Sequence, residues 1–259
     1  MKGRLTMLSG QVLTFVAFFA AWELIVRLLQ IKPVILPPPS IVFEMIWEQR
    51  ALLLKNTWPT FVAITLGFLY AIVFGATIAI GIAFSRVVRE VTYPFLVVAQ
   101  ILPKIAFAPL FLIWFGFGLT PKIVIAALIA FFPIVINMAK GLTSVDQEML
   151  EYMDSLGASR WEKFFKISLP WALPYIFAAL KISITLAIVG AVVGEFVAAG
   201  EGLGYVINAA NISLDTTLMF AAIVVLSVLG VALFLVLVLL ERLVMPAASG
   251  TVEAASTTM

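Results

Sequence analysis

Three charged side chains lie inside long apolar runs of the sequence, and they are the first candidates for chemistry. Lys104 falls near the middle of one run, whereas Lys181 and Glu195 lie in another. A charge in an apolar membrane segment is costly, so such a residue is a functional hypothesis by default. The chain contains no histidine and no cysteine, which removes the commonest general base, thiol catalysis and most transition-metal sites. The sequence therefore predicts no catalytic residue, no metal site and no cofactor.

The composition identifies the environment of these charges. Of 259 residues, 63% are hydrophobic and only 12% are charged, whereas a soluble domain is nearer half apolar and a quarter charged. A water-soluble fold of this size cannot hide so much apolar surface, which excludes soluble enzymes, nucleic-acid binders and disordered chains. A membrane β-barrel needs alternating segments of roughly ten residues, but the apolar runs here are continuous and longer. The predicted fold class is therefore an all-α protein embedded in a lipid bilayer.

Six apolar runs are long enough to cross a membrane, because a transmembrane helix needs about 20 mostly apolar residues. They cover residues 11–29, 58–84, 93–115, 121–140, 171–197 and 217–244. We divide the chain accordingly into an N-terminal segment with the first helix (1–30), an external proline-rich loop with a short interfacial helix (31–57), a transmembrane core (58–244) and a C-terminal tail (245–259).

Two local interactions are expected around the external loop. Glu23 and Arg27 are four residues apart, so they can pair on one face of the first helix. Ser40 follows three prolines and is expected to cap the interfacial helix 41–48.

Lysine and arginine residues predict the orientation of the six helices. With the N-terminus inside, the inner side holds Lys2, Arg4, Arg86, Arg89, Lys140, Arg160, Lys163, Lys166 and Arg242. The outer side holds fewer, namely Arg27, Lys32, Arg50, Lys55 and Lys122. Because positive charge is enriched in cytoplasmic loops, we expect a multi-pass protein of the cell (inner) membrane with both termini cytoplasmic.

The longest cytoplasmic loop, residues 141–170, is charged but patterned for helix. Its apolar residues recur at helical spacing, as Val145, Met149, Met153 and Leu156. Gly157 follows them, at a position typical of a helix terminus and turn. The pattern predicts a helix–turn–helix that leaves apolar side chains to face a partner.

Five residues of this loop stand at characteristic spacings. Glu151 lies six residues before Gly157, and an I-x-L-P sequence with Ile167, Leu169 and Pro170 begins ten residues after that glycine. The loop resembles the EAA loop of permease subunits of ATP-binding-cassette (ABC) importers, which forms a coupling helix docked in a groove of the ATPase subunit. This chain departs from the family where Tyr152 and Met153 replace two alanines. The resemblance assigns ATPase coupling to Glu151, Tyr152, Met153, Gly157, Ala158, Ile167, Leu169 and Pro170.

The resemblance covers nearly the whole chain. Segments 36–40 (LPPPS), 102–110 (LPKIAFAPL), 114–118 (WFGFG) and 202–205 (GLGY) look like those of sulfonate, taurine and nitrate permeases. Related permeases carry riboflavin or pyrimidine precursors of thiamine.

The resemblance implies the type I importer permease fold with six transmembrane helices. It also implies two copies of an ATPase subunit, an external solute-binding protein and a second permease copy in a homodimer, with no nucleic acid. The solute would be a vitamin or vitamin precursor, or an anion such as sulfonate, taurine or nitrate.

Lys104, Gly190, Gly194 and Glu195 are candidates for the solute pathway or for helix packing. Gly190 and Gly194 form a G-x-x-x-G sequence, and small residues four apart let helices approach closely. That contact serves packing within one chain, a dimer interface or a pathway wall. A cation at Lys104 would favour anionic or electron-rich solutes, unless the residue is structural.

An ion-coupled secondary transporter is the alternative function. It would need a carboxylate or a broken-helix ion site near the middle of the membrane. The acids of the spans, Glu23, Glu195 and Glu241, lie near helix ends instead. The chain also lacks the G-x-x-x-x-G-K-[ST] phosphate loop, so ATP hydrolysis would belong to a separate subunit.

Overall fold

The computed structural model describes the backbone of residues 2–198 and 200–245, with side chains from residue 13 onward. Within these residues the chain forms helices and no strand, which confirms the all-α class. The helices are α1 (Lys2–Leu28), α2 (Pro39–Glu48), α3 (Arg50–Phe84), α4 (Arg86–Ile101), η1 (Lys104–Phe107), α5 (Ala108–Phe115), α6 (Leu119–Thr143), α7 (Gln147–Ser155), α8 (Arg160–Lys163), η2 (Phe164–Ser168), α9 (Leu169–Val197), α10 (Leu203–Ile212) and α11 (Thr216–Val244). Beyond Met245, the predicted tail lies outside the described residues.

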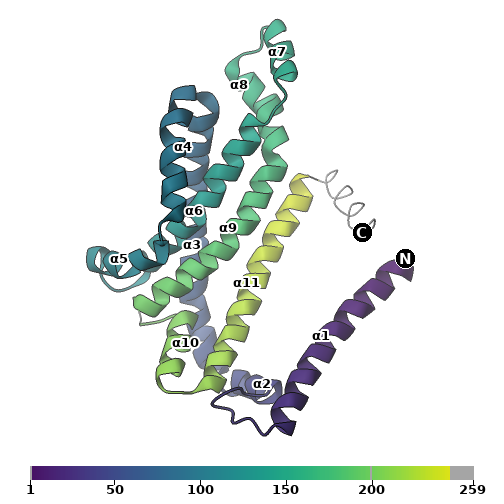
Figure 1. Ribbon diagram of the computed structural model, residues 1–259, viewed down its shortest axis with the longest axis vertical. Coiled ribbons are helices and arrows are strands. Elements are labelled where there is room, and N and C mark those ends of the chain that lie inside the picture. The colour runs from purple at the N-terminus through teal and green to yellow at the C-terminus, as the bar shows by residue number, and fades with distance from the viewer. Residues whose placement is uncertain (1, 199, 246–259) are drawn as a thin grey trace.

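Helices α3, α6 and α9 pack together as the core of the molecule (Figure 1). Gly67 of α3 and Gly190 of α9 both face Ala126 of α6. A Cβ atom added at Gly67 would lie 2.5 Å from the Ala126 Cβ, and one at Gly190 would lie 2.7 Å from the Ala126 Cα. Small residues therefore set the spacing of the three helices, as is common where apolar burial alone gives no drive for association in lipid.

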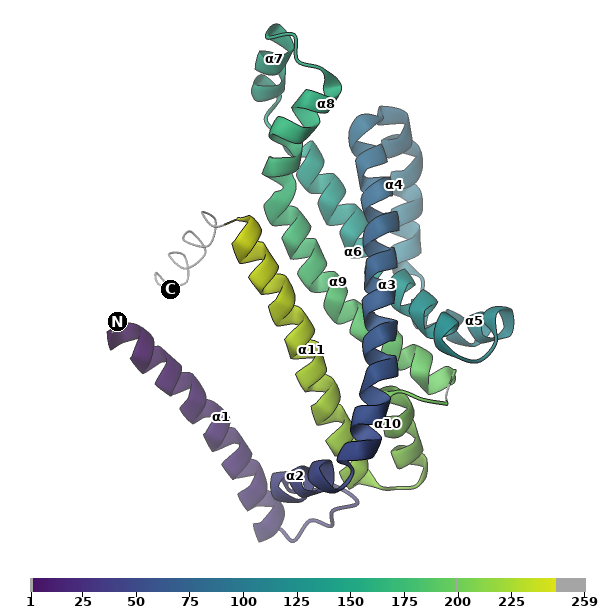
Figure 2. The same ribbon diagram turned by 180° about the vertical axis from the view of Figure 1, so that it is seen from behind.

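Four helical segments are long and apolar enough to cross a membrane, within the residues that the structure describes. They are Arg50–Phe84, Leu119–Thr143, Arg160–Val197 and Thr216–Val244. A bent pair, Arg86–Ile101 with Lys104–Phe115, makes five if it counts as one span. The first predicted span, 11–29, falls in α1, most of which projects away from the core (Figure 2).

The third predicted span is not one straight helix. The chain bends by 84° between α4 and the η1–α5 segment. Pro103 lacks a backbone N–H, and the residue before a proline is pushed out of helical geometry. Leu102 accordingly has extended backbone angles of φ −63° and ψ 134°. The sequence predicts a span over 93–115 in which Pro94, Pro103 and Pro109 permit kinks, and the structure places a sharp bend at the Leu102–Pro103 pair.

The fifth predicted span begins earlier than expected. Helix is continuous from Arg160 to Val197, through α8, a π-helical turn at η2 and α9. Pro170 follows the π-helical turn directly, and Ser168 and Leu169 before it keep helical backbone angles, so the helix continues past this proline. The second helix of the helix–turn–helix predicted over 141–170 is therefore continuous with α9, so the fifth helix starts before residue 171.

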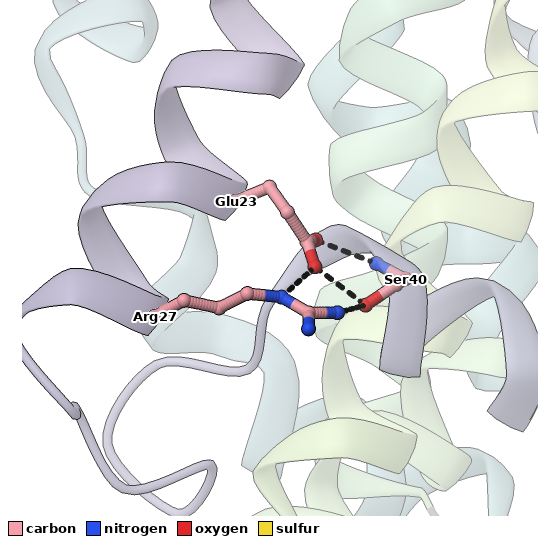
Figure 3. Close-up of polar contacts among 3 residues, drawn as sticks. All are labelled: Glu23, Arg27 and Ser40. Carbon is pink, nitrogen blue, oxygen red and sulfur yellow. Dashed lines mark hydrogen bonds and ion pairs between the residues drawn. The ribbon is translucent and has the colours of Figure 1, made fainter.

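Helix α1 is held to α2 by a small polar cluster (Figure 3). Arg27 Nε donates to Glu23 Oε1 over 2.6 Å, which confirms the predicted pair. The backbone N–H of Ser40 donates to Glu23 Oε2 over 3.0 Å, and the Ser40 hydroxyl donates to Oε1 over 2.8 Å. Ser40 does not cap α2, because the cap residue is Pro38 and the Ser40 side chain points to α1 instead.

Candidate coupling site and transmembrane charges

Helices α7 and α8 form the helix–turn–helix that the sequence predicts, at one end of the molecule (Figure 1). Asp146 caps α7 by accepting the backbone N–H of Glu148 over 3.1 Å. Gly157 follows α7 with φ +73°, a left-handed angle that favours glycine. Ser159 then caps α8 in a capping box with Glu162. Each helix end is fixed by local sequence, so the turn has a defined shape.

The turn between α7 and α8 is closed by an ion pair. Lys163 Nζ lies 2.6 Å from Asp154 Oδ1, across the turn at Gly157. The Glu162 carboxylate accepts the backbone N–H of Ser159 over 2.9 Å and a hydrogen bond from Lys166 Nζ over 3.1 Å.

An aromatic cluster fastens α8 to the end of α3. The ring of Phe84, the last residue of α3, lies 5.0 Å from the ring of Trp161 and 5.1 Å from that of Phe164. Phe164 is buried. The turn is therefore packed against α3 on one side and is continuous with α9 on the other.

The outer face of α7 leaves apolar side chains uncovered. Tyr152 is 64% exposed and Leu156 is 63% exposed. Glu151 is also exposed and accepts a hydrogen bond from Gln147 over 2.9 Å. Met153, which we expected on the same open surface, is half-buried instead, as is Ala158. The uncovered surface is thus centred on Tyr152 and Leu156.

The remaining residues of the predicted coupling motif lie in the helix that leads into α9. Ile167 and Leu169 are half-buried and Pro170 is exposed. The structure therefore does not gather the eight motif residues into one surface. Glu151 and Tyr152 lie on α7, whereas Ile167, Leu169 and Pro170 connect α8 to the core.

Lys104 lies at the bend that interrupts the third span. Its Nζ donates to the Gln100 carbonyl over 3.1 Å and stands 4.6 Å above the Phe132 ring. It has no carboxylate partner among the described residues. The bend therefore carries a half-buried cation beside the face of an aromatic ring.

Lys181 of α9 is paired with Glu241 of α11. Its Nζ lies 2.8 Å from Glu241 Oε2 and 2.9 Å from Oε1, and both side chains are about a quarter exposed. In the sequence these residues are two unrelated charges, because 60 positions separate them.

Glu195 is fully buried near the far end of α9 and accepts two hydrogen bonds. The Thr60 hydroxyl of α3 donates to its Oε1 over 2.7 Å, and the backbone N–H of Gly204 donates to Oε2 over 2.7 Å. The Thr60 oxygen also accepts the N–H of Leu203 over 2.8 Å. Glu195 thus joins α3 and α9 to the start of α10.

Two further buried polar residues complete this cluster, and sequence reasoning missed both. Asn56 Oδ1 accepts the backbone N–H of Gly202 over 2.8 Å. Lys122 was counted as an outer-loop charge, but its side chain is fully buried on α6 and its Nζ donates to the Glu201 carbonyl over 2.7 Å. We call Asn56, Thr60, Lys122 and Glu195 the polar anchor, because all four hold the start of α10 or the two residues before it.

The two glycines of the G-x-x-x-G sequence face α6 of the same chain. A Cβ atom added at Gly194 would lie 2.8 Å from the Lys122 Cα, as Gly190 lies against Ala126. The close approach positions the buried Lys122 beside α9. From the sequence alone, the two glycines could have packed within one chain, at a dimer interface or along the pathway wall.

Comparison with known proteins gives consistent matches. The sequence model of the family described as "Binding-protein-dependent transport system inner membrane component" matches residues 71–246. The chain is 36% identical over 236 residues to the riboflavin transport system permease protein RibX of Chloroflexus aurantiacus, covering 90% of this chain and 88% of RibX. It is 33% identical over 235 residues to the formylaminopyrimidine transport permease protein ThiX of Halalkalibacterium halodurans, covering 90% and 94%. An inward-facing structure of the MetNI methionine ABC transporter matches with a TM-score of 0.66 at 21% identity, covering 76% of this chain and 98% of that chain.

Proposed function

The chain belongs to the family of binding-protein-dependent transport system inner membrane components, and from that membership we propose how it works within an ABC importer. It is a permease subunit with the fold of type I importer permeases. The chain itself carries out no catalysis. A separate ATPase supplies the energy, and this chain converts closure of the ATPase pair into a switch between outward and inward openings.

The segment α7–α8 is the coupling element. The observation that carries this assignment is its uncovered apolar surface, Tyr152 and Leu156, on a turn continuous with α9. Burying a large apolar side chain in a partner groove is favourable by roughly 1.5–3 kcal/mol. A push on the turn would move α9 as one body, because helix is unbroken from Arg160 to Val197.

The membrane topology is six spans with both termini cytoplasmic, α1 being the first span. Toward the α7 end of the molecule, α1 begins and α11 ends (Figures 1 and 2). The arginines and lysines of the predicted inner side, including Arg86, Lys140 and Arg160, also lie on elements of that end. Reporter fusions at the C-terminus and in the turn 213–215 should report opposite sides of the membrane. The same side for both would contradict the topology.

The transported solute is a small nitrogen heterocycle, such as riboflavin or a pyrimidine precursor of a vitamin. The support is the similarity to RibX and ThiX over nine-tenths of this chain. Of the lysines in the spans, Lys181 is ion-paired and Lys122 is held by a backbone carbonyl, which leaves Lys104 beside Phe132 as the cation for an electron-rich ring.

A second copy of this chain, two ATPase copies and an external solute-binding protein complete the importer. The proposed complex is tested by reconstitution in vesicles with the ATPase and the binding protein. We expect ATP-dependent uptake of the ligand that the binding protein holds, and none without the ATPase. Uptake driven by an ion gradient alone would favour the secondary transporter and contradict the proposal.

A further inference from the structure

A cationic cavity of about 300 Å³ lies between the α7–α8 turn and the rest of the chain. Its walls come from the ends of α3 and α6, from α4, and from the α7–η2 segment. Arg89, Arg160 and Lys163 line it, and no aspartate or glutamate does. The volume is at the lower end of the range for small-molecule sites.

The arginines of this cavity are available to a ligand. Neither Arg89 nor Arg160 has an ion-pair partner in the part of the chain that the structure describes. Lys163 is already paired with Asp154 at 2.6 Å. Two unpaired guanidinium groups are suited to the oxygens of a phosphate, which arginine binds in bidentate fashion.

Most of the remaining lining is apolar, and part of it lies at the ends of membrane spans, as Phe84 of α3 and Leu142 of α6 do; Thr143 and Ser168 add hydroxyl groups. Phe84 is the last residue of α3, and buried Phe164 packs against it. On α4, Tyr93 lies one helical turn after Arg89, on the same face of the helix, and is 56% exposed. A ligand with a phosphate beside an apolar body fits this combination, and basic pockets between spans on the cytoplasmic side are typical sites of anionic lipid headgroups.

We propose that this cavity binds the phosphate of an anionic phospholipid from the cytoplasmic leaflet. The bound headgroup would link Arg89 of α4 to Arg160 of α8, and so hold the coupling turn against the membrane. The uncovered residues Tyr152 and Leu156 do not line the cavity, so the lipid and the ATPase use different surfaces. The choice of leaflet rests on the proposed orientation, but the binding itself does not.

The test uses the purified permease–ATPase complex in detergent and counts bound lipid by native mass spectrometry. Phosphatidylglycerol is the probe and zwitterionic phosphatidylcholine is the comparison. We expect phosphatidylglycerol to bind preferentially, and the double variant Arg89→Gln/Arg160→Gln to bind it about thirtyfold more weakly, at about 1 kcal/mol for each arginine. If the double variant does not fold, each single variant should show about a fivefold loss.

The control is Arg86→Gln on the same helix. Arg86 is paired with Glu90 at 2.8 Å, its side chain is 88% exposed, and it does not line the cavity. We expect it to bind phosphatidylglycerol like the wild type. Equal binding by the double variant and the wild type would overturn the proposal.

Two further binding measurements distinguish the phospholipid from a soluble anion and from the ATPase itself. Inorganic phosphate that binds as tightly as phosphatidylglycerol would identify a soluble anion and overturn the lipid assignment. Phosphatidylglycerol that binds only after the ATPase is removed would show that the cavity belongs to the ATPase interface, which would also overturn it. Neither binding measurement follows transport, so failure here is distinct from failure of the importer function.

Discussion

Thr60 of α3 donates a hydrogen bond of 2.7 Å to Glu195 of α9 in a site where both side chains are fully buried. The same Thr60 oxygen accepts the backbone N–H of Leu203, so one hydroxyl joins two core helices and α10. The polar anchor therefore ties the end of the core opposite α7 into one body (Figure 1).

Thr60→Val should destabilise the protein, because the near-isosteric side chain leaves Glu195 and the Leu203 N–H without their partner. A buried polar group left unsatisfied costs about 1–3 kcal/mol. The measurement is thermal unfolding of the purified chain in detergent. Thr77→Val is the matched control, since Thr77 is exposed on the same helix and bonds only to the Val73 carbonyl. Equal melting temperatures for the two variants would refute the anchor.

Gly190→Ala should also destabilise the fold. The added Cβ would lie 2.7 Å from the Ala126 Cα, and an overpacked core contact costs about 1–3 kcal/mol. Gly81→Ala is the control, because its nearest neighbour, a Val88 methyl, would be 3.6 Å away. A melting temperature of Gly190→Ala at or above that of Gly81→Ala would mean that α6 and α9 do not pack as described.

Lys104→Met should slow solute uptake several-fold while ATPase binding and thermal stability stay normal. The reason is that Lys104 is a half-buried cation at the bend, free of any carboxylate among the described residues and beside Phe132. A cation there would attract electron-rich solutes. Uptake by reconstituted vesicles measures the effect, with the exposed Lys55→Met of α3 as control. Unchanged uptake would make Lys104 a structural residue.

Local sequence predicted the features that depend on neighbouring residues. Apolar run length identified most helices, and the i,i+4 spacing identified the Glu23–Arg27 pair. Gly157 marked the turn after α7 because a left-handed residue there favours glycine. Pro103 was visible as a possible kink, but the size of the 84° bend depends on how α5 packs against α6.

The long-range polar contacts were not predictable in this way. Lys122 and Asn56 looked like loop and surface residues because their partners, the Glu201 carbonyl and the Gly202 N–H, are backbone groups distant in sequence. Lys181 and Glu241 looked like separate charges because 60 positions divide them in the sequence. Such partners become apparent only when α3, α6, α9 and α11 are placed together in space.

Leu156→Ser should weaken the binding of the ATPase without loss of folding. Leu156 directly follows α7 and is 63% exposed, so the substitution should change the stability of the free chain little. Docking in a groove of the ATPase would lose the roughly 1.5–3 kcal/mol that burial of the leucine side chain contributes. Co-purification of the ATPase measures the effect. Ile212→Ser, at a residue 75% exposed at the end of α10, should leave it unchanged. Equal recovery of the ATPase with both variants would remove Leu156 from the docking surface.

The central claim is that the α7–α8 turn couples the ATPase to movement of α9. Gly157 has φ +73° and no atom near the position of an added Cβ, so a substitution there acts through the backbone angle alone. A β-branched residue at such an angle costs of order 1–3 kcal/mol, whereas asparagine tolerates it.

The most direct measurement compares Gly157→Val with Gly157→Asn in reconstituted vesicles, following solute uptake and ATP hydrolysis together. We predict that Gly157→Val inserts in the membrane but loses uptake, through lost ATPase binding or uncoupled hydrolysis, while Gly157→Asn retains most of both activities. Wild-type uptake with Gly157→Val would contradict the account, because the shape of this turn would then not matter for coupling.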